Sequence, residues 1–397
     1  MLKKILPLLI AVSLILGLSA VTVFAAGDEM PSFNNGQGGT VEATGVNDGN
    51  GVVKIGKTLK LLNAGTTHPA ETFYLVQTGK ETAHSSVASD AAPDLDLVTD
   101  AGYSGTYRLV GKVPFGEGEV TTTTGTKKYI EIGLPEFTAV GIYTYTLAEV
   151  DSKTAGIQYW ANPIKLIITV VENDDGKFYI EGIHCEKEFD PLNENGTKTD
   201  NFDNIYKANS VDPDDGGLRI EKEVTGNLGD RDKYFDFTVT FRAETGMNYA
   251  TAPTVTVSPT SNTSNPTSLD FTGLSATNPI TVTFKLKHGE TIAFGNVPYG
   301  VTYAYTEANY SGEEYVTSYP QKNSGTDPDT GDAIMVDDKD GTINSVSVSY
   351  KVTNDKNRPI DTGVIVDSLP YVLALAAVML CGVFFVIKRR RNADDLA

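Results

Sequence analysis

Short stretches of alternating apolar and polar residues constrain the fold of this chain more than any other feature. From residue 52 to residue 355, runs rich in Val, Ile, Thr, Tyr and Phe recur about every ten residues and are separated by Gly, Asn and Asp clusters. This spacing is typical of antiparallel β-sandwiches, whose strands are short and joined by turns. We find no long amphipathic helical window in this part of the sequence. The pattern therefore predicts an all-β fold.

The length of the chain, 397 residues, is enough for two domains. The segment 207–217 is acidic, contains a proline and ends in a Gly pair, which is typical of a linker. We therefore expect a first sandwich over 52–206 and a second over 218–355. The Gly- and Asn-rich residues 26–51 show no periodicity, and we expect them to form a flexible arm.

The first 25 residues have the features of a secretory signal peptide. Lys3 and Lys4 precede an apolar run, and small residues follow that run where a signal peptidase would cut. We expect the mature chain to begin at Ala26. The alternative is a membrane-anchored N-terminus.

The C-terminal part of the chain contains a candidate membrane span. Residues 369–387 carry no charge and are numerous enough to cross a bilayer as a helix. The tail 388–397 begins with Lys-Arg-Arg-Arg, and basic residues beside a span stay in the cytoplasm. The sequence therefore predicts that the body of the protein is extracellular, with residues 356–368 as a stalk before the span.

The charge and the distribution of reactive residues exclude several classes of function. Asp and Glu number 51 against 32 Lys and Arg, and the net charge of -19 repels the phosphates of nucleic acid. Cys185 and Cys381 lie in the exported part and in the span, so no disulfide framework is expected. The four histidines are scattered, and the acidic turn at 337–341 lacks the final glutamate of a calcium loop. We expect no metal, no cofactor and no hydrolase site.

Two lysines lie on apolar faces of predicted strands. Residues two apart share one face of a strand, which places Lys57 and Lys222 among apolar residues at the start of each predicted domain. Their neighbours on these faces are Val53, Ile55, Leu59, Leu218, Ile220 and Val224. A buried lysine costs several kcal/mol unless it is paired, neutralised or chemically consumed.

Each predicted domain also has a glutamate and an asparagine in phase with apolar residues. Glu149 and Glu307 continue the apolar face of Tyr-rich strands, and Asn204 and Asn354 lie on the last strand of each domain. The order Lys, Glu, Asn therefore occurs twice, at similar separations.

These three residue types allow a lysine amine to attack an asparagine side-chain amide, which releases ammonia and leaves an isopeptide bond. Burial favours the neutral amine of lysine and the protonated acid of glutamate. The acid can donate to the amide carbonyl and then pass a proton to the departing ammonia. The alternative is a buried Lys-Glu ion pair with a hydrogen-bonded asparagine. The assignments are Glu149 and Glu307 as catalytic residues and Lys57–Asn204 and Lys222–Asn354 as cross-links.

The sequence around these residues resembles the immunoglobulin-like modules of Gram-positive backbone pilins and related collagen-adhesin B-type domains. The second domain contains LRIEKEVTGNLGDRDKYFDFTVTF, YGVTYAYTEANY and YKVTNDK, and the first contains VVKIGKTLK, GIYTYTLAEV and NFDNIY. The resemblance implies two tandem immunoglobulin-like sandwiches with self-generated isopeptide bonds. In the first domain Lys54 and Lys60 are competing amines, and the parity of the strand favours Lys57.

The residues before the membrane span resemble the cell-wall sorting signal of Gram-positive bacteria. Pro359, Thr362 and Gly363 precede the apolar span and the basic tail, although two residues rather than one separate the proline from the threonine and no leucine precedes the proline. The resemblance implies that a sortase cuts the Thr362–Gly363 bond and transfers the threonine carbonyl to an amine. The alternative is a simple single-span anchor.

These features together predict a structural subunit of a sortase-assembled pilus, attached to the cell wall. Its expected partners are sortase, neighbouring pilin subunits and peptidoglycan. The alternative is a monomeric wall-anchored adhesin that binds a host or surface ligand. Related two-domain pilins look to use a loop lysine shortly before the closing asparagine of the first domain, which here is Lys198, with Lys187 and Lys322 in reserve.

Overall fold

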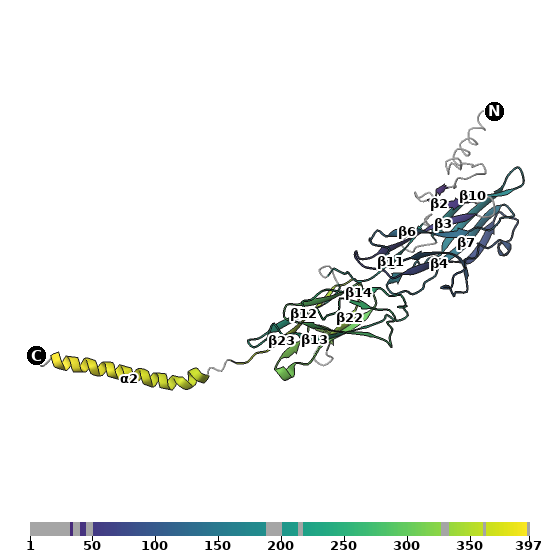
Figure 1. Cartoon of the computed structure of the whole chain (residues 1–397). Helices are drawn as coiled ribbons and strands as arrows, with labels where there is room; N and C mark the ends of the chain where they lie inside the picture. Colours follow the sequence, from purple (N-terminus) through teal and green to yellow (C-terminus); the bar gives the residue numbers. More distant parts are fainter. Residues whose placement is uncertain are drawn as a thin grey trace, which may run out of the picture.

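The computed structural model consists of two β-sandwiches followed by one long C-terminal helix, all arranged end to end (Figure 1). The predicted all-β fold with tandem immunoglobulin-like sandwiches is confirmed. The signal peptide and Ala26 lie outside the described residues. The structure describes residues 32–34, 40–44, 51–187, 201–212, 217–326, 333–359 and 363–394.

The first sandwich is built from two facing sheets. In one sheet the strand order is β1-β2-β3-β11-β8, with β6 also paired to β3, and in the other it is β10-β9-β7-β4-β5. The strands are β1 (Ser32–Asn34), β2 (Thr40–Thr44), β3 (Val52–Leu61), β4 (Glu71–Ala83), β5 (Arg108–Phe115), β6 (Thr126–Gly133), β7 (Gly141–Glu149), β8 (Ile157–Gln158), β9 (Ile164–Glu172), β10 (Phe178–Lys187) and β11 (Asn201–Tyr206), with a short 3-10 helix η2 (Ser89–Ala91).

The second sandwich also has two facing sheets and a separate two-stranded ribbon. The sheet orders are β15-β14-β17-β12-β23-β19 and β16-β13-β18-β22, and β20 pairs with β21. The strands are β12 (Leu218–Thr225), β13 (Phe235–Arg242), β14 (Thr254–Val257), β15 (Ser268–Asp270), β16 (Ile280–Leu286), β17 (Thr291–Gly295), β18 (Thr302–Glu307), β19 (Val316–Ser318), β20 (Gln321–Thr326), β21 (Ala333–Asp337), β22 (Asp340–Thr342) and β23 (Val348–Asp355), with a 3-10 helix η3 (Ser311–Glu313).

In both sandwiches a long strand near the start of the domain lies parallel to its last strand. β3 pairs with β11, and β12 pairs with β23. Alternating side chains of β12 are buried along its whole length, as expected for a strand with one face on the core. The two parallel pairs bring residues from opposite ends of each domain side by side, and they form the framework of the candidate site.

The described part of the predicted linker packs between the two sandwiches. Ala208 and Asn209 are buried, and the Asn209 backbone N–H donates to the carbonyl of Val297 in the second sandwich. Asn296 joins the domains from the other side, because its amide nitrogen lies 3.0 Å from the carbonyl oxygen of Thr67. The side chains at this junction are therefore held by hydrogen bonds to both sandwiches.

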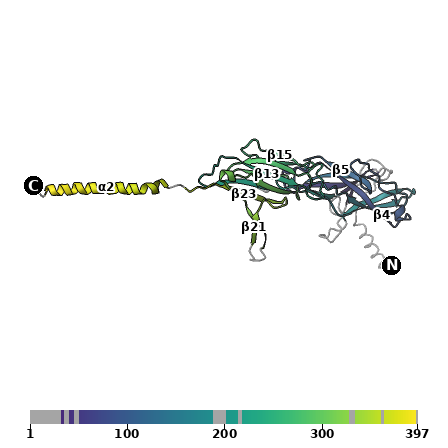
Figure 2. The same cartoon turned by 90° about the horizontal axis from the view of Figure 1, so that it is seen from below.

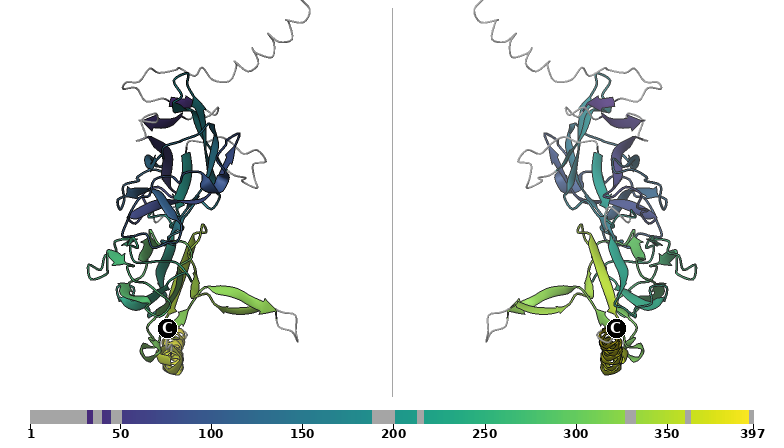
Figure 3. Two further views of the ribbon diagram at one scale, coloured as in Figure 1. Left: turned by 90° about the vertical axis from the view of Figure 1, so that its right-hand side faces the viewer. Right: turned by 90° about the vertical axis from the view of Figure 1, so that its left-hand side faces the viewer.

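The β20–β21 ribbon projects sideways from the second sandwich (Figures 2 and 3). The C-terminal helix α2 (Gly363–Asp394) continues beyond that sandwich. Its segment Pro370–Arg389 has a mean hydropathy of 2.5 and buries none of its residues against the rest of the protein. This segment overlaps the predicted span 369–387, and its length and composition fit a membrane anchor.

Candidate functional site

Lys57 lies in the core of the first sandwich, on the inner face of β3. Its side chain has 0% exposure, and the alternate residues Ile55 and Leu59 are buried on the same face. The two competing lysines lie on the opposite face: Lys54 is 3.6 Å from Glu131, and Lys60 pairs with Asp203. The alternation of side chains along β3 therefore places the Lys57 amine in the core and the Lys54 and Lys60 amines on the partly exposed outer face.

The carboxyl group of Glu149 reaches Lys57 from the facing sheet. Glu149 is the last residue of β7, and its Oε1 lies 2.7 Å from Lys57 Nζ and 3.0 Å from Asn204 Nδ2. Its other oxygen, Oε2, accepts a hydrogen bond from the Trp160 backbone N–H at 2.7 Å. A single carboxyl oxygen thus contacts both the lysine nitrogen and the asparagine amide nitrogen.

The second sandwich contains a similar group of residues. Lys222 Nζ lies 2.8 Å from Glu307 Oε1, and both side chains have 0% exposure. Glu307 Oε2 accepts a hydrogen bond from the Thr317 hydroxyl at 3.1 Å. Asn354 is also fully buried, and neither its amide nitrogen nor its carbonyl oxygen has a hydrogen-bond partner among the described residues. This asparagine therefore lies unpaired in the core.

The lysine and the asparagine have the same register in both sandwiches. Lys57 stands opposite Phe202, and Asn204 follows two residues later on β11. Lys222 stands opposite Val352, and Asn354 likewise follows two residues later on β23. Because residues two apart share a face, each asparagine points to the same side of its sheet as the lysine.

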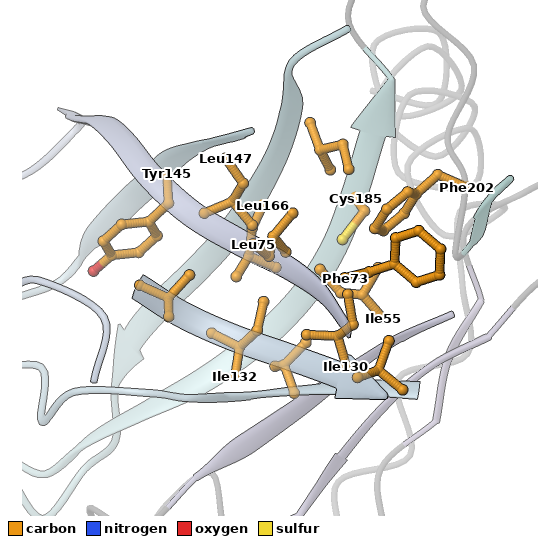
Figure 4. Packing of buried hydrophobic residues seen from close by; sticks show 14 of the residues in the cluster. Ile55, Phe73, Leu75, Ile130, Ile132, Tyr145, Leu147, Leu166, Cys185 and Phe202 are labelled. Atoms are coloured by element: carbon orange, nitrogen blue, oxygen red, sulfur yellow. The ribbon is translucent and has the colours of Figure 1, made fainter. Parts of the chain in front are cut away.

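Aromatic rings enclose both lysine amines. Lys57 Nζ lies 4.1 Å from the ring centroid of Phe202 and 4.7 Å from that of Phe73. Figure 4 shows these two rings next to each other at one end of the drawn cluster, close to Ile55. In the second sandwich, Lys222 Nζ lies 4.5 Å from the centroid of Phe235. These rings exclude water from the amines and so increase the cost of the charged form.

Burial shifts the protonation of Glu149 and Lys222 towards their neutral forms. It raises the pKa of the Glu149 carboxyl, and the nearby Lys57 only partly offsets this effect. In the second sandwich, burial lowers the pKa of Lys222 to about 8, with Glu307 acting in the opposite direction. About one Lys222 amine in ten is then neutral at pH 7. A neutral amine is nucleophilic, whereas an ammonium is not.

Comparison with known families and proteins agrees with this geometry. Residues 53–207 match the family described as "Spy0128-like isopeptide containing domain", and residues 216–356 match one described as "domain of unknown function (DUF7601)". A protein named "Pilin" from Streptococcus pyogenes serotype M1 is 28% identical over 270 residues, which cover 64% of this chain and 69% of that protein. The chain is therefore similar to Gram-positive pilins.

Solved structures of similar sequence are also pilins. The major pilin from Streptococcus pyogenes has 22% identity and a TM-score of 0.47, and the alignment covers 78% of this chain and 100% of that chain. The T3.2 major pilin of the same species has 19% identity and a TM-score of 0.45, with 78% and 99% covered. The pilin relatives are cell-surface proteins that assemble with other pilin subunits. The family match and the sequence of the streptococcal pilin support the same structural class for this chain.

The residues predicted to join this pilin to its neighbours lie largely outside the described part of the chain. Thr362 and Lys198 are not among the described residues, and Gly363 is the first residue of α2. Lys187 ends β10. Lys322, on β20, lies 2.7 Å from Asp340, and this hydrogen bond raises the pKa of the lysine.

Sequence reasoning missed the residues that hold the second carboxyl oxygen of each glutamate. Thr317 is a single polar residue on a three-residue strand, so no periodicity distinguishes it. The Trp160 contact uses the backbone N–H, which carries no sequence signal. Among the described residues, no group of three or more His, Cys, Asp or Glu side chains could hold a metal ion.

Proposed function

We propose that this pilin subunit cross-links itself with two isopeptide bonds, Lys57–Asn204 and Lys222–Asn354, in which Glu149 and Glu307 transfer protons. The observation that carries the proposal is the repeated contact of a buried lysine with a buried glutamate, at 2.7 and 2.8 Å, beside an asparagine in the same register. The chemistry follows from these contacts.

The reaction begins with the neutral amine of Lys57, which attacks the side-chain amide carbon of Asn204. One C–N bond forms and the bond to the amide nitrogen breaks, so that each cross-link releases one ammonia. Glu149 Oε1 lies within 3.0 Å of both nitrogens, so the protonated oxygen can give its proton to the leaving amide nitrogen and then take one from the attacking amine. The groups are already close in a dry core, which removes the entropic cost of bringing them together.

The alternative, a buried ion pair with a hydrogen-bonded asparagine, explains the second sandwich poorly. A buried amide without hydrogen bonds costs about 1–3 kcal/mol, yet Asn354 is fully buried and unpaired. A buried Lys-Glu pair also loses much of its attraction to desolvation. Conversion to an isopeptide reduces both costs, because the lysine charge disappears and the amide keeps one N–H in place of two.

Each bond would join a long strand near the start of a sandwich to its last strand. The closed loops span about 150 and about 130 residues, and by analogy with disulfides each closure stabilises the fold by about 5 kcal/mol. Tension applied at the two ends of a domain would pass through the covalent link instead of separating the paired strands. This property suits a subunit of a thin extracellular fibre.

We further propose that a sortase cuts between Thr362 and Gly363 and joins Thr362 to Lys198 of the next subunit or to peptidoglycan. The apolar segment Pro370–Arg389 would hold the chain in the membrane until cleavage. Lys322 is a poorer candidate acceptor than Lys198, because its partner Asp340 favours the charged ammonium.

The internal bonds are tested by peptide mapping of the full chain, expressed in a sortase-deficient host and digested after denaturation. We expect two branched peptides, Lys57–Asn204 and Lys222–Asn354, each lighter by one ammonia than its two linear components. Glu149→Ala should remove only the first branched peptide and Glu307→Ala only the second. Linear peptides at both sites in the unmutated chain would refute the proposal.

Polymer assembly is tested separately in a host that has the sortase. Lys198→Arg keeps the charge and removes the transferable amine, so the ladder of covalent polymers should disappear while wall-linked monomer and both internal bonds remain. Lys322→Arg is the matched control and should leave the ladder intact. An intact ladder in Lys198→Arg would direct attention to Lys187 or Lys322.

A further inference from the structure

The second oxygen of each glutamate accepts a hydrogen bond from a short strand of the facing sheet or from the segment that directly follows such a strand. In the second sandwich this strand is β19, where Thr317 pairs directly with Asn354 of β23. The Thr317 hydroxyl donates to Glu307 Oε2 at 3.1 Å, and the Glu307 backbone N–H donates to the hydroxyl of Tyr319 at 3.0 Å. Glu307 is therefore bonded to β19 through its side chain and to the residue after β19 through its backbone.

The first sandwich has a similar support with a different donor. The short strand β8 pairs with β11 through Gln158 and Ile205, and Trp160 follows two residues after Gln158. The backbone N–H of Trp160 donates to Glu149 Oε2 at 2.7 Å. Thus the segment after β8 supplies a backbone donor in the first sandwich, and β19 supplies a side-chain donor in the second.

These donors determine which carboxyl oxygen can carry a proton. A backbone N–H can only donate, so the Trp160 contact favours an unprotonated Oε2 and a proton of the neutral acid on Oε1, which also accepts from the Asn204 amide. The Thr317 hydroxyl, which donates to Glu307 Oε2, favours the same arrangement on Glu307. In both cases Oε1 is the oxygen that contacts the lysine amine, at 2.7 and 2.8 Å.

We propose that Thr317 is a positioning residue for isopeptide formation, which keeps the exchangeable proton of Glu307 on the oxygen that faces Lys222. This inference rests on the proposed function. Because Trp160 supplies a main-chain donor, the first sandwich does not depend on any side-chain hydroxyl for this step. Loss of the hydroxyl at position 317 should therefore slow formation of the second bond and leave the first bond unaffected.

The test follows both bonds in one molecule. The full chain is made by cell-free translation, samples are quenched in acid at successive times, and linear and branched peptides are quantified for each sandwich. In Thr317→Val, which has similar shape and no hydroxyl, the second bond should form about 10- to 100-fold more slowly, the factor expected when one hydrogen bond to an acidic group is lost. Thr317→Ser should restore the rate to within a few-fold, and the first bond is the internal control.

A second comparison separates loss of the hydroxyl from loss of the fold. Thr317→Val and Thr317→Ala are each placed in a Lys222→Met background, in which the second bond cannot form, and their melting temperatures are compared with that of Lys222→Met alone. The inference is overturned if a hydroxyl-free variant with an unchanged melting temperature forms the second bond at the wild-type rate. It is also overturned if Thr317→Ser is as slow as Thr317→Val. Absence of the branched Lys222–Asn354 peptide in the unmutated chain would instead refute the proposed function itself.

Discussion

The two sandwiches place the same three residue types in the same register but support them differently. In the first, Glu149 accepts hydrogen bonds from both the Asn204 amide and the Trp160 backbone. In the second, Asn354 has no hydrogen bond among the described residues, and a threonine hydroxyl supplies the second donor to Glu307. The same strand register therefore brings these residue types together in both sandwiches, whereas their hydrogen-bond partners differ.

The largest loss of stability should come from removing the two proposed cross-links one at a time. Lys57→Met or Lys222→Met should each lower the stability of its own sandwich by about 5 kcal/mol, because the unfolded chain regains the entropy of an open loop. Calorimetry of the detergent-solubilised chain should show one transition moving to lower temperature while the other stays near its wild-type position. Equal shifts of both transitions in each variant would show that the sandwiches do not unfold separately.

The junction offers a way to test how far the two sandwiches depend on each other. Asn296 is buried, and its amide nitrogen lies 3.0 Å from the carbonyl oxygens of both Thr67 and Thr254. Asn296→Ala should destabilise the protein by about 2 kcal/mol, since the carbonyls of Thr67 and Thr254 lose their donor and the Thr67 N–H loses its acceptor, Asn296 Oδ1. Hydrogen exchange should increase at the Thr67 N–H relative to the unmutated chain, and unchanged exchange there would contradict the expected coupling.

The pH dependence of bond formation should show the titration of the second lysine. The pKa of Lys222 is lowered to about 8, so the neutral amine increases about tenfold for each pH unit below that value and levels off above it. We therefore expect the second bond to form about tenfold faster at pH 7 than at pH 6. Time courses of the branched peptide at several pH values measure this, and a rate that falls as the pH rises from 6 to 7 would contradict the assignment of Lys222 as the nucleophile.

Replacing the competing lysines of the first sandwich should have the smallest effect on stability and on bond formation. Lys54 and Lys60 are paired with Glu131 and Asp203 on the outer face of β3, and partly exposed pairs contribute under about 1 kcal/mol. Lys54→Arg and Lys60→Arg should each leave the Lys57–Asn204 peptide unchanged in mass and yield. Its loss in either variant would show that the wrong amine had been assigned.

Residue spacing along the strands was enough to predict that lysine and glutamate side chains of the two candidate sites would be buried. Lys57, Lys222 and Glu307 each alternate in phase with the apolar residues of their strand. All three side chains are buried in the structure. The all-β fold and the membrane span were predictable for the same reason, since both depend on local periodicity or length.

Only the tertiary structure decided what meets each of these residues across the core. The alternation of residues along a strand shows which face a side chain occupies, but not which residue of the facing sheet it contacts. The 2.7 Å contact between Lys57 and Glu149 could therefore be seen only in the packed sandwich. The same holds for Thr317, whose short strand has no periodic signal, and for Asn209, which lies in a segment that reads as a linker but is buried between the domains. Local sequence determines which side of a strand a residue occupies, whereas contacts between distant segments depend on how the sheets pack together.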